Sequence, residues 1–280
     1  MFDRPEDHRS LQLQLEQFIR HWYGNRKPWY GISEERLAAT RLPDPLRWIY
    51  GYAGAWDGLN YSDTLFGNQD CLVNFEELYT RDGKLVFAHE NQGVWCVGTE
   101  PVGADPPVWA HLDGHGWKPL DDSLMHFLTT LILHETVFGC QHLESQEDAY
   151  AALSAAGFLI VPLWMNAPYP WCLMDMGFPP VTIHLANGRY LLMNDWVATN
   201  EPEPWKALPH IFEKKDLSAG VGLTLDPWDA IPDHLEIPKI VKVSHLRTVI
   251  HRHELEAEHH TKRAAVFRRM LGELEARDGK

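Results

Sequence analysis

Histidines are the residues of this sequence best suited to chemistry, because the imidazole ring exchanges protons near neutral pH and also ligates metals. The chain has 280 residues and 16 histidines, four of which lie close together near its end: His251, His253, His259 and His260. On one helix, His251 and His253 point to different sides, and His253 and His260 are two turns apart. This spacing favours a solvated, charged helix, and a metal-dependent enzyme is kept as the third-ranked hypothesis.

A second histidine motif lies mid-chain, where His134-Glu135 begins like the zinc-protease motif His-Glu-x-x-His. Phe138 stands where that motif requires its second histidine, which excludes the motif. We therefore expect His134 on the rim of a mostly buried helix. His111 and His115 flank a glycine-rich turn and could meet there, but solvation of that turn is the preferred interpretation.

The sequence shows no other catalytic signature. It contains no Gly-x-Ser-x-Gly nucleophile elbow, no P-loop and no Gly-x-Gly-x-x-Gly dinucleotide fingerprint. We nominate no catalytic residue, no cofactor and no metal site, and we predict that the protein is not an enzyme.

The chain is strongly acidic. Lys plus Arg number 25 and Asp plus Glu number 39, which gives a net charge of -14. This balance repels free nucleic acid and suits a basic protein partner. The acidic residues between the expected elements have two interpretations, plain solubility and a recognition surface for such a partner.

Cysteine usage and hydropathy bear on the compartment. The four cysteines form no Cys-x-x-Cys pair, and two of them lie in apolar, strand-like runs. Buried free thiols suit a reducing cytosol. The N-terminal residues lack an apolar leader, and no apolar run approaches the about 18 residues that span a bilayer. We expect a cytoplasmic protein without membrane contact, and its oligomeric state stays open.

The first half mixes helices and strands. Apolar spacing predicts two amphipathic helices, over 11–23 and 45–53. Short apolar runs between turn residues predict four strands, over 72–75, 85–88, 94–98 and 108–112. Ser123 is the expected N-cap of a helix that ends at Gly139 and is apolar enough to be buried on more than one side.

The second half has weaker signals. The pattern predicts a helix over 147–156, extended segments over 158–161 and 163–165, a hairpin of 181–185 with 190–194, a strand over 237–243 and a helix over 261–276. Residues 200–238 show few regular signals. We predict an α+β protein with a twisted, mostly antiparallel sheet flanked by helices over 1–140. An additional α+β region over 141–280 either stands alone or packs into one unit with the first.

An ordered series of motifs runs through residues 10–139. The series comprises Leu42-Pro-x-x-Leu46-Arg47 before an aromatic residue and a glycine, the Glu76-Glu77-Leu78 turn, the hairpin over 84–97, and Asp121-Asp122-Ser123 before the long helix. In this order the motifs resemble the SUKH superfamily, of the Smi/Knr type. The resemblance implies an α+β fold with a twisted sheet and helices, and it supplies no catalytic residues to carry over.

The resemblance also implies a role in binding proteins. Many bacterial members of the superfamily are immunity proteins that neutralise secreted toxins, often nucleases, and fungal members act as signalling scaffolds. Our first hypothesis is therefore an immunity protein that blocks a toxin by direct binding. A regulatory or scaffold protein without a toxin partner is the alternative.

The expected contact surface comprises the loop 55–69 and the hairpin tip 89–93, because loops on a rigid scaffold commonly mediate recognition. The partner-binding residues predicted there are Trp56, Asp57, Asp63, Asp70 and Glu90. Aromatic anchors ringed by polar groups tend to dominate interface energy. Trp95 lies inside an expected strand, so we assign it to the core.

Overall fold

The computed structural model describes residues 8–24, 27, 30–55, 65–174 and 178–211. The chain divides into two compact units, Met1–Glu213 and Lys214–Lys280, and every described residue belongs to the first. The clustered histidines of the C-terminal end and the elements expected over 237–243 and 261–276 lie outside the described residues.

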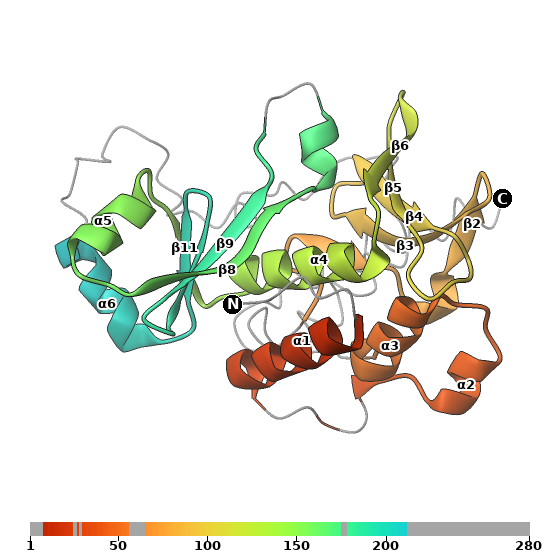
Figure 1. Cartoon of the computed structure of the whole chain (residues 1–280), viewed down its shortest axis with the longest axis horizontal. Helices are drawn as coiled ribbons and strands as arrows, with labels where there is room; N and C mark the ends of the chain where they lie inside the picture. The colour runs from red at the N-terminus through yellow and green to blue at the C-terminus, as the bar shows by residue number, and fades with distance from the viewer. Residues whose placement is uncertain (1–7, 25–26, 28–29, 56–64, 175–177, 212–280) are drawn as a thin grey trace, which may run out of the picture. The chain divides into compact units, whose positions relative to one another are not determined.

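A six-stranded antiparallel sheet forms from the first half of the chain (Figure 1). Its strands are β1 (Asp70–Leu72), β2 (Tyr79–Arg81), β3 (Lys84–Glu90), β4 (Trp95–Thr99), β5 (Val108–Leu112) and β6 (Gly116–Asp121). The order is β1-β3-β4-β5-β6, and β2 also pairs with β3. Asp82 and Gly83 connect β2 to β3 with positive φ angles of 51° and 80°, the geometry of a tight two-residue hairpin turn.

A second, five-stranded antiparallel sheet follows in the chain. Its strands are β7 (His142–Ser145), β8 (Ile160–Ala167), β9 (Val181–Ala186), β10 (Tyr190–Met193) and β11 (Trp196–Thr199), in the order β7-β11-β10-β9-β8. The predicted hairpin turn at Asn187-Gly188 is present, with both residues at positive φ.

Helix α4 (Leu124–Phe138) lies between the two sheets (Figure 1). It packs against β6, against β8 to β11, and against α1 (His8–Tyr23) and α3 (Asp44–Ala53). The hydroxyl of Ser123 accepts the N–H of His126 at 3.0 Å, which confirms the predicted N-cap. Of its 15 residues, 13 are buried, so the expectation of burial on more than one side is also confirmed.

The second sheet is covered on its other face by two helices, α5 (Ala149–Ala155) and α6 (Pro202–Ile211). Because the second sheet is covered on both faces, all four residues of strand β10 are buried. Tyr190 and Leu192 contact the core under α5 and α6, whereas Leu191 and Met193 face the larger core around α4. Alternation along a strand sends neighbouring side chains to opposite faces, so both faces here are apolar.

The remaining described elements are short. They are helix α2 (Glu34–Ala38) and two 3₁₀ turns, η3 (Phe75–Glu77) and η4 (Pro170–Leu173).

The predicted α+β class is confirmed, as are the helix over 11–23 and the strands of the β3–β4 hairpin. The strand expected over 72–75 is wrong in its bounds, since β1 ends at Leu72. The segments expected to be extended over 158–161 and 163–165 lie largely in one strand, β8, and a helix occupies 202–211, where the sequence shows few regular signals. Within the first unit, one apolar core runs from Leu11 to Ala198 and continues across residue 140.

Among the described helices, none combines the length and the apolar character that crossing a membrane requires.

Candidate functional site

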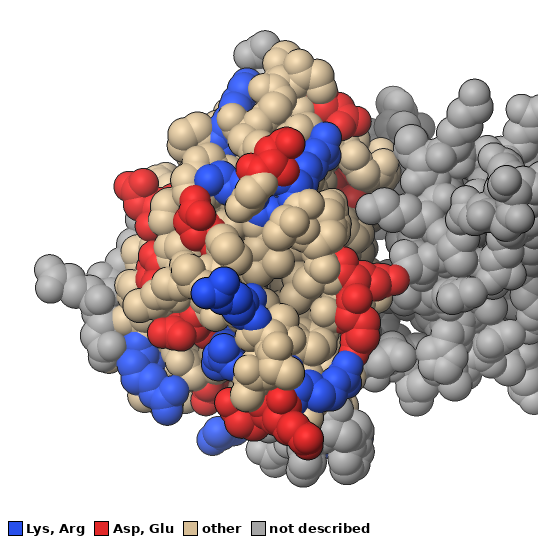
Figure 2. Space-filling view, turned by 90° about the vertical axis from the view of Figure 1, so that its right-hand side faces the viewer, with Lys and Arg blue, Asp and Glu red and all other residues tan. Residues whose placement is uncertain are grey.

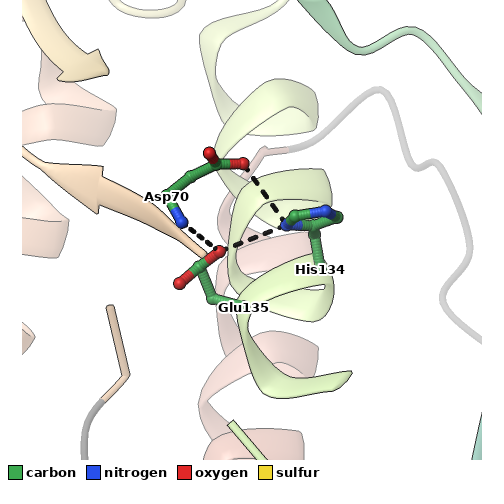
Figure 3. A group of neighbouring side chains, drawn as sticks. All are labelled: Asp70, His134 and Glu135. Carbon is green, nitrogen blue, oxygen red and sulfur yellow. Dashed lines mark hydrogen bonds and ion pairs between the residues drawn. The ribbon is translucent and has the colours of Figure 1, made fainter. Parts of the chain in front are cut away.

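The carboxylate of Glu135 holds the segment that leads into β1 (Figure 3). Its two oxygens accept three successive backbone N–H groups, from Asn68 at 2.8 Å, Gln69 at 3.0 Å and Asp70 at 2.8 Å. Consecutive N–H groups that converge in this way form a nest that favours an anion. The bend at Gly67, with φ of +90°, precedes the nest. One side chain of α4 therefore anchors a loop that lies far away in the sequence.

The end of α4 is closed by the same loop. The side-chain amide of Asn68 donates to the backbone carbonyl of Glu135 at 3.2 Å, and the N–H of Gly139 donates to that carbonyl at 2.8 Å. A Cβ at position 139 would lie 2.5 Å from the amide nitrogen of Asn68. Glycine is required here by space and not by φ, which is an ordinary -83°.

Three further polar groups meet beside this anchor. His134 Nδ1 lies 3.2 Å from Glu135 Oε1 and 3.6 Å from Asp70 Oδ2. The hydroxyl of Tyr169 donates to Asp70 Oδ2 at 2.7 Å and lies 3.4 Å from His134 Nδ1. We call Asp70, His134, Glu135 and Tyr169 the interior cluster. It joins β1, α4 and the segment between β8 and η4.

Aromatic rings wall the interior cluster on one side. The ring of His134 lies 4.7 Å from that of Tyr169, 4.8 Å from that of Phe138 and 5.0 Å from that of Trp171, measured between centroids. Such walls lower the local dielectric and strengthen every electrostatic interaction inside them.

The interior cluster is sealed from solvent. Asp70 is 2% exposed, and His134, Glu135 and Tyr169 are 0% exposed. Burial raises the pKa of Asp70 to about 7, and the neighbouring imidazole opposes this rise. Burial also raises the pKa of Glu135 to about 7 against its backbone donors, and lowers the pKa of His134 to about 4. The imidazole is therefore neutral near pH 7.

This arrangement limits the chemistry that the cluster can perform. A general acid or base must lie within hydrogen-bonding reach of its substrate, and these groups have almost no accessible surface. The donor atoms of Asp70, His134 and Glu135 all lie within 4.8 Å of one another, which is close enough for them to share a cation. The cluster is suited to holding three segments together.

Of the five predicted partner-binding residues, the structure describes two, Asp70 and Glu90. Asp70 does not lie on an exposed surface, and its expected place there is wrong, because its backbone and side chain both bond inside the interior cluster. Trp56, Asp57 and Asp63 lie outside the described residues. Trp95 is 5% exposed, which confirms its assignment to the core.

Glu90 lies at the tip of the β3–β4 hairpin, where it is half-buried. Its Oε2 accepts the N–H of Gln92 at 2.7 Å and the N–H of Val94 at 3.1 Å. The side chain of Val94 is exposed beside this turn. Glu90 thus fixes the backbone of the tip and leaves an apolar residue facing solvent.

Two other histidine predictions can be checked. His134 lies deeper than expected, in the core and not on a rim. His111 is buried with its ring 5.2 Å from that of Trp117, whereas His115 is exposed on the turn.

Sequence reasoning did not identify the interior cluster. A usable signal existed, because two ionisable residues in the middle of an apolar helix need buried polar partners. His134 and Glu135 stand in that position, but the sequence does not say which distant residues approach them.

Comparisons with known proteins do not assign the chain to a family. No family model, no curated protein and no solved structure matches the chain. The resemblance of residues 10–139 to the SUKH superfamily therefore stays a prediction.

Proposed function

We propose that this protein binds another protein, and that it is a bacterial immunity protein which neutralises a toxin by direct contact. The observation that supports this most is the hairpin tip from Glu90 to Val94. Recognition commonly uses loops that a rigid scaffold holds in place.

The tip is exposed and is held by hydrogen bonds within the turn. The carboxylate of Glu90 bonds two backbone N–H groups within the turn, and Gly93 provides the positive φ of 78° that the turn needs. Asn91, Gln92 and Val94 are exposed. A preorganised loop loses less conformational entropy on binding than a mobile one, so its contacts yield more affinity.

The charge of the partner follows from the charge of the chain. A net charge of -14 attracts a basic protein and speeds its capture. The face in Figure 2, on the side of the six-stranded sheet, shows acidic and basic side chains interspersed around uncharged areas. We therefore assign long-range attraction of the partner to the net charge of the whole chain, and shape complementarity with the partner to the local contacts at the tip. Trp56, Asp57 and Asp63 remain the sequence-based candidates for the rest of the surface.

Direct binding would neutralise the toxin by covering its functional surface. The interior cluster, being sealed, takes no part in contact with the toxin. We accordingly assign the protein no catalytic residue and no enzymatic step.

The test uses the genes beside this one. A large toxin-like reading frame next to this gene would supply a toxin domain, and we expect co-expression of the full-length protein to restore growth of cells that produce it. Purified protein should bind that domain in a 1:1 titration. Absence of rescue and of binding, or stable association with housekeeping proteins alone, would refute the toxin and favour a regulatory or scaffold protein.

A further inference from the structure

The two carboxyl groups of the interior cluster lack a basic partner. Among the described residues, neither Asp70 nor Glu135 pairs with Lys or Arg, and the imidazole of His134 is the nearest ionisable base. Buried charges in proteins are paired or coordinate metals, because an isolated buried charge is strongly unfavourable. Within the described part of the chain, protons or a cation are left as the species that could neutralise the pair.

The spacing of the donor atoms is compatible with a shared cation. Zinc bound to nitrogen and oxygen at about 2.0–2.2 Å places neighbouring ligands of a tetrahedron about 3.3–3.6 Å apart. His134 Nδ1 lies 3.2 Å from Glu135 Oε1 and 3.6 Å from Asp70 Oδ2, and all three donor atoms lie within 4.8 Å of one another. The shorter distance also suits a hydrogen bond between His134 and Glu135, whereas the longer one does not suit a hydrogen bond between His134 and Asp70.

The groups around these donors resemble an outer coordination shell. Tyr169 donates to Asp70 Oδ2, and three backbone N–H groups fix the carboxylate of Glu135. Hydrogen bonds of this kind orient metal ligands and hold them in place. Asp70 Oδ1 is buried and without a partner among the described residues, so the same carboxylate offers a fourth donor atom. His134 Nε2 departs from this pattern, because it lacks a partner among the described residues and aromatic rings lie around the imidazole.

We propose that Asp70, His134 and Glu135 bind one divalent transition-metal ion, zinc in preference to others, in a closed structural site. One imidazole and two carboxylates match zinc better than magnesium or calcium, which favour six or more oxygen ligands. The ion would join the start of β1 to α4. This metal site goes beyond the proposed function, because zinc binding does not depend on any protein partner.

The experiment uses the untagged, full-length protein. After removal of metal with a chelator, the protein is titrated with zinc chloride, and bound zinc is measured by calorimetry and elemental analysis. We expect about one equivalent of tightly bound zinc, with a melting temperature that rises with zinc concentration. Asp70→Asn preserves the shape of the side chain and should weaken zinc binding by about 100-fold or more, since loss of outer-shell partners alone gives 10- to 100-fold.

Two further variants make the result decisive. His134→Gln should lose the same equivalent of zinc, whereas His115→Asn, which alters an exposed histidine, should keep it. Equal zinc uptake by wild-type protein, Asp70→Asn and His134→Gln would show that surface histidines bind the metal and would overturn the proposal. Absence of tight zinc in the wild-type protein would also overturn it and leave protons as the neutralising species.

Discussion

Glu135 and Glu90 perform the same local task in two different surroundings. Each carboxylate accepts backbone N–H groups and thereby shapes a bend, Glu135 from three successive residues before β1 and Glu90 from Gln92 and Val94 at the tip of the β3–β4 hairpin. Glu135 is 0% exposed and acts across 65 positions of sequence, whereas Glu90 is half-buried and acts within four.

The difference shows that burial, more than hydrogen-bond count, sets the energetic weight of such an anchor. At the tip, water replaces a lost acceptor at little free-energy cost. In the core, no water replaces the lost acceptor, so each N–H left without a partner costs its full desolvation free energy. We infer that the interior anchor maintains the fold and that the outer one shapes a contact surface.

The strongest test of this comparison removes each carboxylate in turn. Glu135→Ala should lower the free energy of unfolding by about 3–5 kcal/mol, because three buried N–H groups lose their acceptor. Glu90→Ala should lower it by about 0.5 kcal/mol, because solvent reaches the tip. Denaturant titration of both variants measures the difference. Losses of equal size would contradict the assigned role of burial.

A second test concerns the closure of α4 by Asn68. In Gly139→Ala, the new methyl group would lie 2.5 Å from the Asn68 amide and 3.0 Å from the carbonyl of Glu135. We expect a loss of about 1–3 kcal/mol in the free energy of unfolding, as for other overpacked sites. The double variant Gly139→Ala, Asn68→Ala should lose less than the sum of the two single changes. Simple additivity would show that the loop and the helix end are not coupled.

A smaller effect separates charged from neutral hydrogen bonds in the core. At about pH 8, above the pKa of about 7 that burial gives Asp70, Tyr169→Phe removes the donor to an ionised carboxylate and should lower the free energy of unfolding by about 1.5–3 kcal/mol. Tyr50 is equally buried but donates to the backbone carbonyl of Val73, so Tyr50→Phe should lower it by about 1 kcal/mol. The reverse ranking in thermal or chemical unfolding would indicate that Asp70 is protonated and needs no donor.

Local signals explain which parts of the fold could be predicted. Asn187-Gly188 predicts a hairpin wherever it stands between apolar runs, and the apolar length of α4 predicts its burial. Strand β11 is only four residues long, and its place is set by pairing with β10 and β7. The helix over 202–211 contains three prolines, which weaken its sequence signal.

The interior cluster shows why a site is harder to predict than an element. Asp70 stands among polar turn residues, which normally indicates exposure. Its burial depends on Glu135 and on Tyr169, which lies 99 positions away. Periodicity reports which face of an element is apolar, but it does not report which distant polar groups meet inside the core. The residues 56–64 of the predicted contact loop lie outside the described part of the chain.

The most direct measurement of the proposed function is calorimetric titration of the toxin domain into two matched variants. Val94→Lys places a positive charge on the exposed hairpin tip, whereas Val102→Lys places it on an exposed loop at the opposite end of β4. We predict that Val94→Lys weakens binding to the basic toxin domain by about tenfold or more, as expected for an interface hot spot, while its melting temperature stays near that of the wild type. Val102→Lys should bind as the wild type does. Unchanged affinity in Val94→Lys would contradict the assignment of the tip as the contact surface.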